Sequence, residues 1–244
     1  MGKQHQRQMK ITFFSDIHGN HYAFHSFQRQ MELLQPNQVV FLGDVFGYYY
    51  GQEEILNQLR NSGYICLLGN HDQMFLDMYA GKQNTEWLCA RYGSSYRRNL
   101  GAISKENRDF LKSLPTSWEL KCDDIQIKAF HGTPQNPLEG RLYPDTKVED
   151  VSPYTVCDYL FLGHTHHKMI RQVGHTAVIN PGSLGQQRDG LGCSYVLFDT
   201  CSRKAEFFRI DYPVSALITE IREKDPDMPG LIEVLQRRPK RMCQ

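Results

Sequence analysis

Five short apolar runs in this chain of 244 residues each stop at a polar side chain beside a glycine. The runs lead into SDIHGN, LGD, LGNHD, FHG and LGHTH. Because the carboxyl ends of strands in an open α/β sheet meet along one crevice, polar residues far apart in the sequence can converge there. The pattern predicts strands that deliver one set of side chains to a shared edge: Asp16, His18, Asp44, Asn70, His131, His164 and His166.

The first half of the chain alternates between strand-like and helix-like stretches. Each short β-rich run is followed by a stretch whose apolar residues recur at helical spacing. Such alternation predicts parallel strands joined by crossover helices, which is the α/β class. The strand and helix pairs are 9–14 with 21–34, 39–44 with 53–60, and 64–70 with 71–80. Residues 84–114 also have a helical pattern, and Ser104 is placed to cap its last helix.

The second half is richer in strand-like runs, with short turns and little helix between them. These runs predict a second, largely antiparallel sheet that packs face to face against the first, with helices outside. Residues 214–237 carry two further helical stretches split by DPDMPG. The runs lie at 117–122, 125–130, 159–163, 168–173, 175–180, 193–199 and 205–210.

The seven polar residues form a donor set typical of a two-metal centre. Four imidazoles, two carboxylates and one amide oxygen, without a thiolate, suit Mn, Fe, Zn, Co or Ni better than Ca or Mg. Two ions about 3.5 to 4 Å apart, bridged by one carboxylate, accommodate all seven donors. In an extended chain, side chains two positions apart point to the same side, so Asp16 with His18 and His164 with His166 can each serve one place. Taken singly, each residue is more simply a turn former or a hydrogen-bonded histidine, and their recurrence at strand ends is what favours metal binding.

Charge balance indicates that any attraction for an anion is local. Lys plus Arg number 28 and Asp plus Glu number 27, so no overall field favours nucleic acid or an anionic membrane. The seven scattered cysteines form no Cys-X-X-Cys pair, the start MGKQHQRQ has no apolar segment behind it, and no run approaches the ~18 apolar residues that span a bilayer. We expect a cytoplasmic protein with no nucleic-acid or membrane partner, and we leave homo-oligomerisation open.

The motifs DXH, GD, GNHD, an isolated HG and GHTH, in this order, resemble the calcineurin-like metallophosphoesterase superfamily. GDVFGY, ISKENRDFLKSLP, HGTPQNPLEGRLYPDT and NPGSLGQQRDG look like its small prokaryotic phosphodiesterase-like branch. The resemblance covers about residues 9–212, with 213–244 as a C-terminal helical extension packed on the same domain. It implies an α/β fold, a four-layer α/β/β/α sandwich of two mixed sheets flanked by helices.

The resemblance also implies roles for individual residues. By position, Asp16, His18, Asp44 and His166 would hold one metal ion, and Asp44, Asn70, His131 and His164 would hold the other, with Asp44 as the bridge. His71 matches the histidine that lies near the leaving group without binding metal. The phosphoprotein phosphatases continue GD as GDXXDRG, whereas Gly47 and Tyr48 stand here in place of Asp and Arg. This departure weakens a phosphoprotein-phosphatase assignment and removes the usual acidic partner of the catalytic histidine.

These residues predict metal-dependent hydrolysis of a phosphoester, and we expect a phosphodiester of a nucleotide or other small molecule. A hydroxide held between the metals would attack phosphorus in line, and His71 would protonate the departing oxygen. Arg188 and the Arg and Tyr residues between 91 and 98 are candidates for substrate contact, although exposed Arg and Tyr are more often plain surface.

Several alternatives stay open at this point. Within the same enzyme class, the chain would be a dinucleoside polyphosphate hydrolase or a phosphomonoesterase. A catalytically silent metal-binding scaffold would keep the ligands without turnover. A non-haem iron oxygenase would use Asp16, His18 and His166 as a facial triad, but it leaves the other four donors unexplained.

Overall fold

The computed structural model describes residues 9–238. The polar stretch 1–8, on which the cytoplasmic expectation partly rests, lies outside the described residues, as does 239–244. The strands are β1 (Lys10–Phe14), β2 (Gln38–Phe41), β3 (Ile65–Cys66), β4 (Ser117–Cys122), β5 (Ile125–Phe130), β6 (Tyr159–Leu162), β7 (Lys168–Val173), β8 (Thr176–Pro181), β9 (Ser194–Asp199) and β10 (Lys204–Arg209). The helices are α1 (His21–Leu34), α2 (Gln52–Asn61), α3 (Asn70–Tyr79), α4 (Thr85–Tyr92), α5 (Ser95–Asn99), α6 (Lys105–Ser113), α7 (Val214–Lys224) and α8 (Gly230–Glu233).

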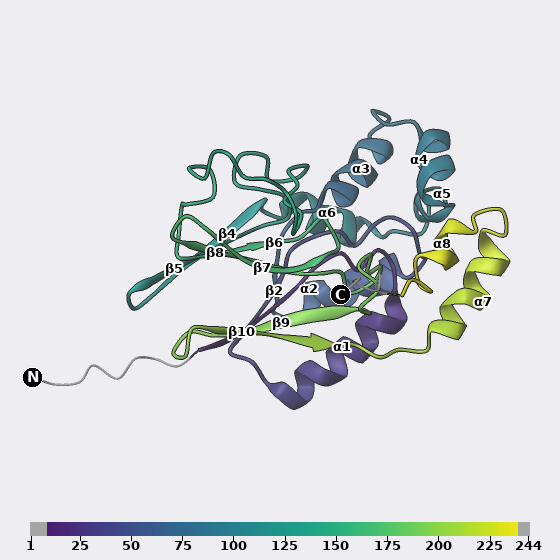
Figure 1. The fold of residues 1–244 in the computed structure, drawn as a ribbon. Helices are drawn as coiled ribbons and strands as arrows, with labels where there is room; N and C mark the ends of the chain where they lie inside the picture. The colour runs from purple at the N-terminus through teal and green to yellow at the C-terminus, as the bar shows by residue number, and fades with distance from the viewer. Residues whose placement is uncertain (1–8, 239–244) are drawn as a thin grey trace, which may run out of the picture.

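These strands form two mixed five-stranded sheets flanked by helices, as the resemblance implied (Figure 1). The first sheet has the order β10-β9-β1-β2-β3, in which β1, β2 and β3 are parallel and β9 and β10 run antiparallel. The second has the order β4-β5-β6-β8-β7, in which β5, β6 and β8 are parallel and the two edge strands are antiparallel. The α/β class and the two mixed sheets are confirmed.

The expectation of one largely antiparallel sheet from the second half is wrong in two respects. Strands β9 and β10 join the first sheet, because β9 pairs with the edge of β1 that β2 leaves free. The second sheet has as many parallel as antiparallel pairings, because the long segment 131–158 carries the chain back before β6 begins. Parallel neighbours need such a crossover, whereas a hairpin produces antiparallel ones.

The stretch 84–114 is helical, as predicted, and consists of three helices, α4, α5 and α6. The first break falls at Gly93, whose φ of +87° lies in the left-handed region that favours glycine. Ser104 caps α6 as predicted, since its side chain accepts a hydrogen bond from the Asn107 backbone N–H at 3.3 Å.

Strand β1 shows how the core positions the two sheets. Ile11 and Phe13 face the second sheet, where the Phe13 ring stacks on Phe161 at a centroid distance of 3.6 Å. Phe14 faces the opposite way and packs on Phe27 of α1 at 4.3 Å. Full burial of such a side chain contributes about 1.5–3 kcal/mol to the stability of the fold. Alternate side chains of β1 therefore pack the first sheet against the second sheet on one face and against α1 on the other.

Helices α7 and α8 lie at the same end of the molecule as α4 and α5 (Figure 1). Leu217, Ile221 and Leu231 pack there around Tyr49, whose hydroxyl donates to the Leu231 carbonyl at 3.2 Å. The C-terminal helices therefore brace the loop after β2, and the division of the chain at residue 213 stays a prediction. Within residues 9–238, no helix has the length and apolar character needed to cross a membrane.

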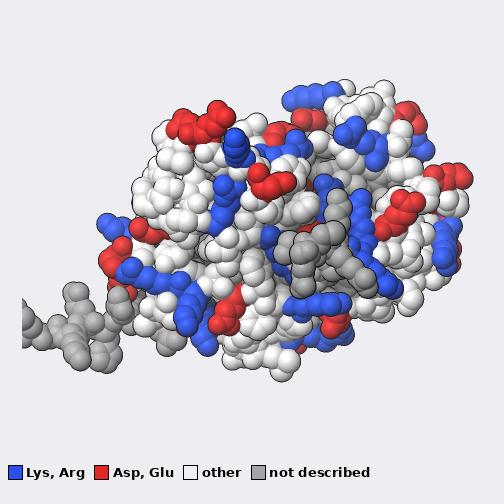
Figure 2. Space-filling model, in the orientation of Figure 1, with Lys and Arg blue, Asp and Glu red and all other residues white. Residues whose placement is uncertain are grey.

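Basic and acidic side chains are interspersed over the face drawn in Figure 2. This distribution agrees with the near-zero formal net charge of +1.

Candidate metal centre

The seven predicted donors lie on five connections that meet at one end of the two sheets. Asp16 and His18 follow β1, Asp44 follows β2, and Asn70 begins α3. His131 follows β5, and His164 and His166 follow β6. All seven are buried, with exposed fractions of 0–6%. The structure thus brings together every residue that the sequence pattern singled out.

One group of donors contains Asp16, His18 and His166. The Nε2 atoms of His18 and His166 are 3.0 Å apart, and His166 Nε2 is 3.3 Å from Asp16 Oδ1. His18 Nε2 is also 3.7 Å from Asp16 Oδ1. Three side chains from two loops therefore present their ligand atoms to one small space, which could hold a metal ion.

A second group contains Asp44, Asn70, His131 and His164. His131 Nε2 lies 2.9 Å from Asn70 Oδ1 and 3.4 Å from Asp44 Oδ2. The same Asp44 oxygen is 3.8 Å from His18 Nε2 of the first group. Asp44 therefore lies between the two groups.

Backbone carbonyl groups orient three of the imidazoles. A histidine that donates through Nδ1 to a carbonyl keeps the lone pair of Nε2 free for a metal ion. The contacts are His18 Nδ1 to Phe46 O at 2.6 Å, His131 Nδ1 to Leu42 O at 2.9 Å, and His166 Nδ1 to Gln186 O at 2.7 Å.

Unpaired buried atoms test whether these residues fit metal ions. Asp16 Oδ1, Asp44 Oδ2 and His164 Nε2 are buried and have no hydrogen-bond partner among the described residues. Leaving such an atom unsatisfied costs about 1–3 kcal/mol. Divalent cations would satisfy all three, and the nitrogen and oxygen donors suit such ions, so the residues present fit a metal pair.

The backbone at the centre is unusual, and it corrects one expectation. Five of the seven donors have φ in the left-handed region, with values of 57° for Asp16, 49° for His18, 71° for Asp44, 65° for His164 and 59° for His166. The DXH and HTH pairs thus converge through tight left-handed turns and not through an extended chain, as the side-chain alternation suggested. Each such non-glycine residue costs about 1–3 kcal/mol, and this kind of strain clusters at functional sites.

A glycine makes the closest approach at the centre possible. A Cβ atom at Gly69 would lie 2.1 Å from Asp44 Oδ1, so only glycine fits there. Next to it, the Asp72 carboxylate accepts hydrogen bonds from the backbone N–H groups of Asp44 at 2.9 Å and Gly69 at 3.0 Å. Asp72 was not singled out from the sequence, although its place in GNHD was the available signal. It ties the loop after β2 to the start of α3 and so fixes Asp44.

Electrostatics at the centre depend on a few close pairs. Burial lowers the pKa of His131, but the nearby Asp44 carboxylate outweighs it and raises that pKa to about 9. Burial raises the pKa of Asp16, yet His166 and other imidazoles outweigh this and hold it below its usual range. In the metal-free protein, His131 is therefore protonated at neutral pH, and a metal ion must displace that proton.

His71 lies beside the donors and has a partner that the sequence did not reveal. Its Nδ1 is 2.7 Å from the hydroxyl of the fully buried Tyr96, and this hydroxyl also donates to the His71 carbonyl at 3.3 Å. A Cβ atom at Gly47 would lie 2.7 Å from the same Nδ1. The histidine therefore has Tyr96 as its partner in place of an acidic residue at position 47.

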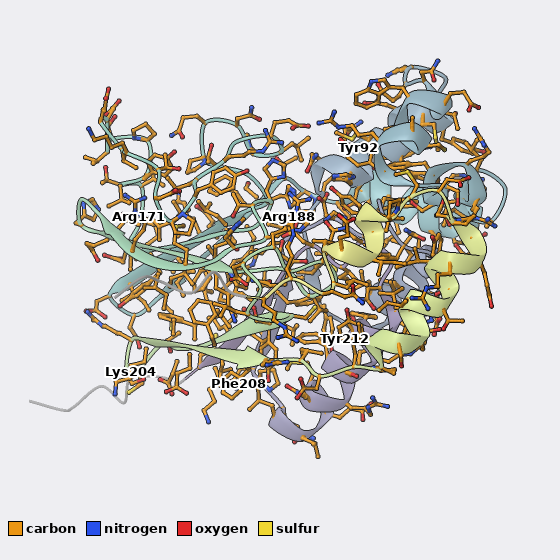
Figure 3. The ribbon with its side chains drawn as sticks, turned by 45° about the vertical axis from the view of Figure 1, so that its right-hand side comes forward. Tyr92, Arg171, Arg188, Lys204, Phe208 and Tyr212 are labelled. Carbon is orange, nitrogen blue, oxygen red and sulfur yellow. The ribbon has the colours of Figure 1, made fainter. Side chains whose placement is uncertain are left out.

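A cleft of about 360 Å³ opens over the centre. Arg188 lies in its wall, where it donates to the Tyr48 hydroxyl at 2.8 Å and to Gln186 Oε1 at 3.2 Å. Figure 3 labels Arg188, from the loop after β8, and Tyr92, from α4. The cleft is lined by Tyr48, Asn70, His71, Met74, Trp87, Arg91, Tyr92, Glu139, Arg141, His164, His166 and Arg188.

Tyr96 is fully buried, and the other candidates between residues 91 and 98 separate into two sets. Arg91 and Tyr92 line the cleft. Arg97 pairs instead with Glu86, and Arg98 donates to the Lys224 carbonyl at 3.1 Å. Only the first set is placed to meet a substrate.

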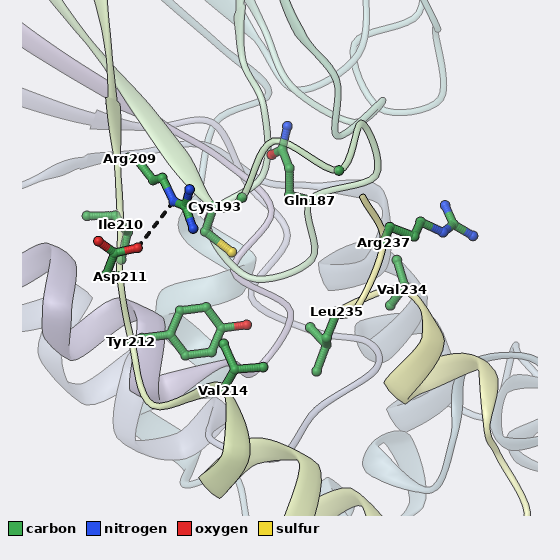
Figure 4. A pocket seen from close by; sticks show the side chains of 12 residues that line it. Gln187, Cys193, Arg209, Ile210, Asp211, Tyr212, Val214, Val234, Leu235 and Arg237 are labelled. Carbon is green, nitrogen blue, oxygen red and sulfur yellow. Dashed lines mark ion pairs between the residues drawn. The ribbon is translucent and has the colours of Figure 1, made fainter. Parts of the chain in front are cut away.

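A second cavity of about 170 Å³ lies between the loop after β8 and the C-terminal helices (Figure 4). Cys193, Tyr212 and Leu235 contribute to its wall, and Arg209 Nε pairs with Asp211 Oδ1 at 3.2 Å. It contains none of the seven donors. The cleft over the donor groups is therefore the candidate site.

Comparisons with known proteins agree with this geometry. A family described as the calcineurin-like phosphoesterase superfamily domain matches residues 9–203. The uncharacterized protein MJ0912 of Methanocaldococcus jannaschii is 29% identical, over 86% of this chain and 91% of its own.

Two solved structures share the fold over nearly their whole length. The hypothetical protein PH1004 from Pyrococcus horikoshii OT3 has a TM-score of 0.75 at 19% identity, with coverage of 95% of this chain and 99% of that one. A metallophosphoesterase from Sphaerobacter thermophilus has a TM-score of 0.70 at 22% identity, with coverage of 94% and 98%. At these identities the likeness shows that the fold is the same.

Proposed function

This chain belongs to the calcineurin-like phosphoesterase superfamily, and we propose that it hydrolyses a phosphodiester of a nucleotide or other small molecule with two bound divalent ions. Membership identifies the chemistry as hydrolysis of phosphoester bonds with divalent metal ions as cofactors. The observation that carries the finer proposal is the position of Asp44 between two buried groups of possible donors, with unpaired atoms in both groups.

The proposed ligand sets follow the two groups. One ion would be held by Asp16, His18, Asp44 and His166, and the other would be held by Asp44, Asn70, His131 and His164. When bound, the ions supply an activated water as the nucleophile and offset the charge on the phosphate. The protein's own part is to hold seven donors in a dry, fixed arrangement, which the backbone contacts of the imidazoles support.

His71 is the proposed proton donor. Hydrolysis joins the oxygen of water to phosphorus, breaks one ester P–O bond and delivers a proton to the departing oxygen. When His71 is protonated, its Nδ1–H donates to Tyr96, which leaves the Nε2 proton for the leaving group. Burial and the neighbouring imidazoles lower the pKa of His71 well below 6.5, and an anionic phosphate in the cleft acts in the opposite direction.

The wall next to His18 departs from the pattern of the phosphoprotein phosphatases at Tyr48. Tyr48 lies where GDXXDRG has its arginine, and its ring contacts the His18 ring at a centroid distance of 4.7 Å. Its hydroxyl also accepts a hydrogen bond from Arg188, so the two side chains join the loops after β2 and β8 beside the centre. We therefore place Arg188 next to the substrate phosphate.

Turnover of bis-p-nitrophenyl phosphate by metal-stripped and Mn²⁺-loaded protein tests the proposal. We expect activity only in the loaded protein, with a loss of about 10²-fold or more in Asp44→Asn. Asp109→Asn, at an exposed residue of α6, is the matched control and should keep full activity. Mn²⁺-loaded protein that holds two ions yet turns over no phosphoester would point to a silent scaffold, and oxygen consumption would point to the oxygenase.

A further inference from the structure

We propose that the cleft selects a nucleotide that carries a second phosphate group, and that Trp87, Arg91 and Tyr92 recognise its base and that phosphate. These three residues, all on α4, are called the α4 wall below. The inference rests on the proposed function, because it names the substrate class of the same site.

The positive charge in the cleft exceeds the single negative charge of a phosphodiester. Arg91, Arg141 and Arg188 come from three separate segments and line the same cleft. Its single carboxylate, Glu139, already pairs with Arg141 at 3.7 Å. Two divalent ions less the Asp16 and Asp44 carboxylates add about two positive charges. A simple diester carries one negative charge, so the guanidinium groups call for a further anion on the substrate.

The α4 wall adds aromatic surface to this charge. Trp87 is 48% exposed, which is unusual for the largest apolar side chain and places its ring at the mouth of the cleft. Tyr92 contacts Trp87 at a centroid distance of 6.2 Å and His71 at 4.7 Å. A row of rings therefore leads from the metal centre to the mouth. Nucleobases stack on such side chains.

Arg91 is held by the same rings and still faces the cleft. Its guanidinium carbon lies 5.6 Å from the Trp87 centroid and 5.7 Å from the Tyr92 centroid. Its Nε donates to the Tyr92 hydroxyl at 3.1 Å, which leaves the terminal nitrogens available to a phosphate. A base on Trp87 would thus place an attached phosphate near Arg91.

Arg188 occupies a different part of the cleft. Its backbone N–H donates to the His166 carbonyl at 3.3 Å, so it belongs to the metal side. Arg188 therefore suits the scissile phosphate, and Arg91, on the other wall, suits the second one. The volume of about 360 Å³ lies within the range of small-molecule pockets.

Three diesters with the same leaving group test the inference on the Mn²⁺-loaded protein. They are methyl p-nitrophenyl phosphate, thymidine 5′-(p-nitrophenyl phosphate), and the latter with a 3′-phosphate. We expect kcat/KM to rise at each step. The base should add about 5- to 150-fold by stacking, and the second phosphate about tenfold, an increment that shrinks at high salt.

Variants separate the two contributions. Trp87→Ala should remove most of the gain from the base, and Arg91→Ala most of the gain from the 3′-phosphate together with its salt dependence. The loss of kcat/KM on the methyl ester, which has neither a base nor a second phosphate, should be smaller than the loss on either nucleotide ester. Arg97→Ala is the matched control, because Arg97 lies on the neighbouring helix and pairs with Glu86 outside the cleft.

The possible outcomes distinguish a failure of this inference from a failure of the proposed function. Equal kcat/KM on all three diesters, or a gain that survives both variants, overturns the inference while leaving the phosphodiesterase intact. No hydrolysis of any diester by protein that has bound its metal overturns the proposed function itself. If only the base raises kcat/KM, and Arg91→Ala does not change this gain, the proposed recognition of a second phosphate is wrong.

Discussion

The hydroxyl of Tyr96 provides the sharpest test of how His71 works. Tyr96→Phe removes one oxygen that lies 2.7 Å from His71 Nδ1 and otherwise keeps the buried ring. A hydrogen bond to a charged group contributes about 1.5–3 kcal/mol, which corresponds to about 10- to 150-fold in rate. That loss should fall on esters with a basic leaving oxygen, because an alkoxide needs a proton that p-nitrophenolate does not.

The assay compares two thymidine 5′-phosphodiesters on fully metallated protein, one with a methyl and one with a p-nitrophenyl leaving group. Tyr96→Phe should slow the methyl ester by the factor above and the p-nitrophenyl ester much less. His71→Asn should give the same pattern with a loss of about 10² to 10⁴ and unchanged metal content. Equal slowing of both esters, or loss of metal, would refute proton donation by His71. If Tyr96→Phe changes the rate on neither ester, the Tyr96 hydroxyl does not assist His71, and Tyr96 serves only in packing.

Two further outcomes follow from the donor groups, and a third follows from the loop after β2. Asp44→Asn should weaken both metal sites while Asp16→Asn weakens one, and a tightly held pair of ions in Asp44→Asn would remove the bridge. Because Asp44 raises the pKa of His131 to about 9, metal binding at pH 7 should release about one proton from His131, with a binding enthalpy that depends on the buffer; buffer independence would contradict this. With Gly47 and Tyr48 in place of Asp and Arg, diesters should be turned over with a higher kcat/KM than phosphoserine peptides, and the reverse order would sink the diester proposal.

The sequence was sufficient to predict which seven polar side chains the fold brings together, because they carry a local signal. A polar residue beside glycine at the end of an apolar run marks the edge of a sheet, and Asp44, His131 and His164 all have this signal. The alternation of strands and helices up to α3 was also predictable, because the spacing of apolar residues within each segment is a local signal. What the pattern missed was the backbone of these turns, because left-handed φ at Asp16 or His18 is imposed by the surrounding fold and not by residue type.

Contacts between segments that are distant in the sequence could not be predicted from local patterns. Tyr96 meets His71 across 25 positions, from a short helix whose place depends on packing. Strand β9 looked like its neighbours in sequence, yet it pairs with β1, more than 180 positions earlier. Period-two patterning predicts that a strand forms, and only the free edges of the sheets decide which partner it takes.

The dependence of phosphodiesterase activity on bound metal tests the central claim most directly. Metal-free protein would be loaded with increasing Mn²⁺, and the metal bound per chain would be measured beside kcat on thymidine 5′-(p-nitrophenyl phosphate). The account predicts that activity rises with the second ion and reaches its maximum at two ions per chain. Full activity with one ion per chain, or activity that persists after chelation, would contradict it.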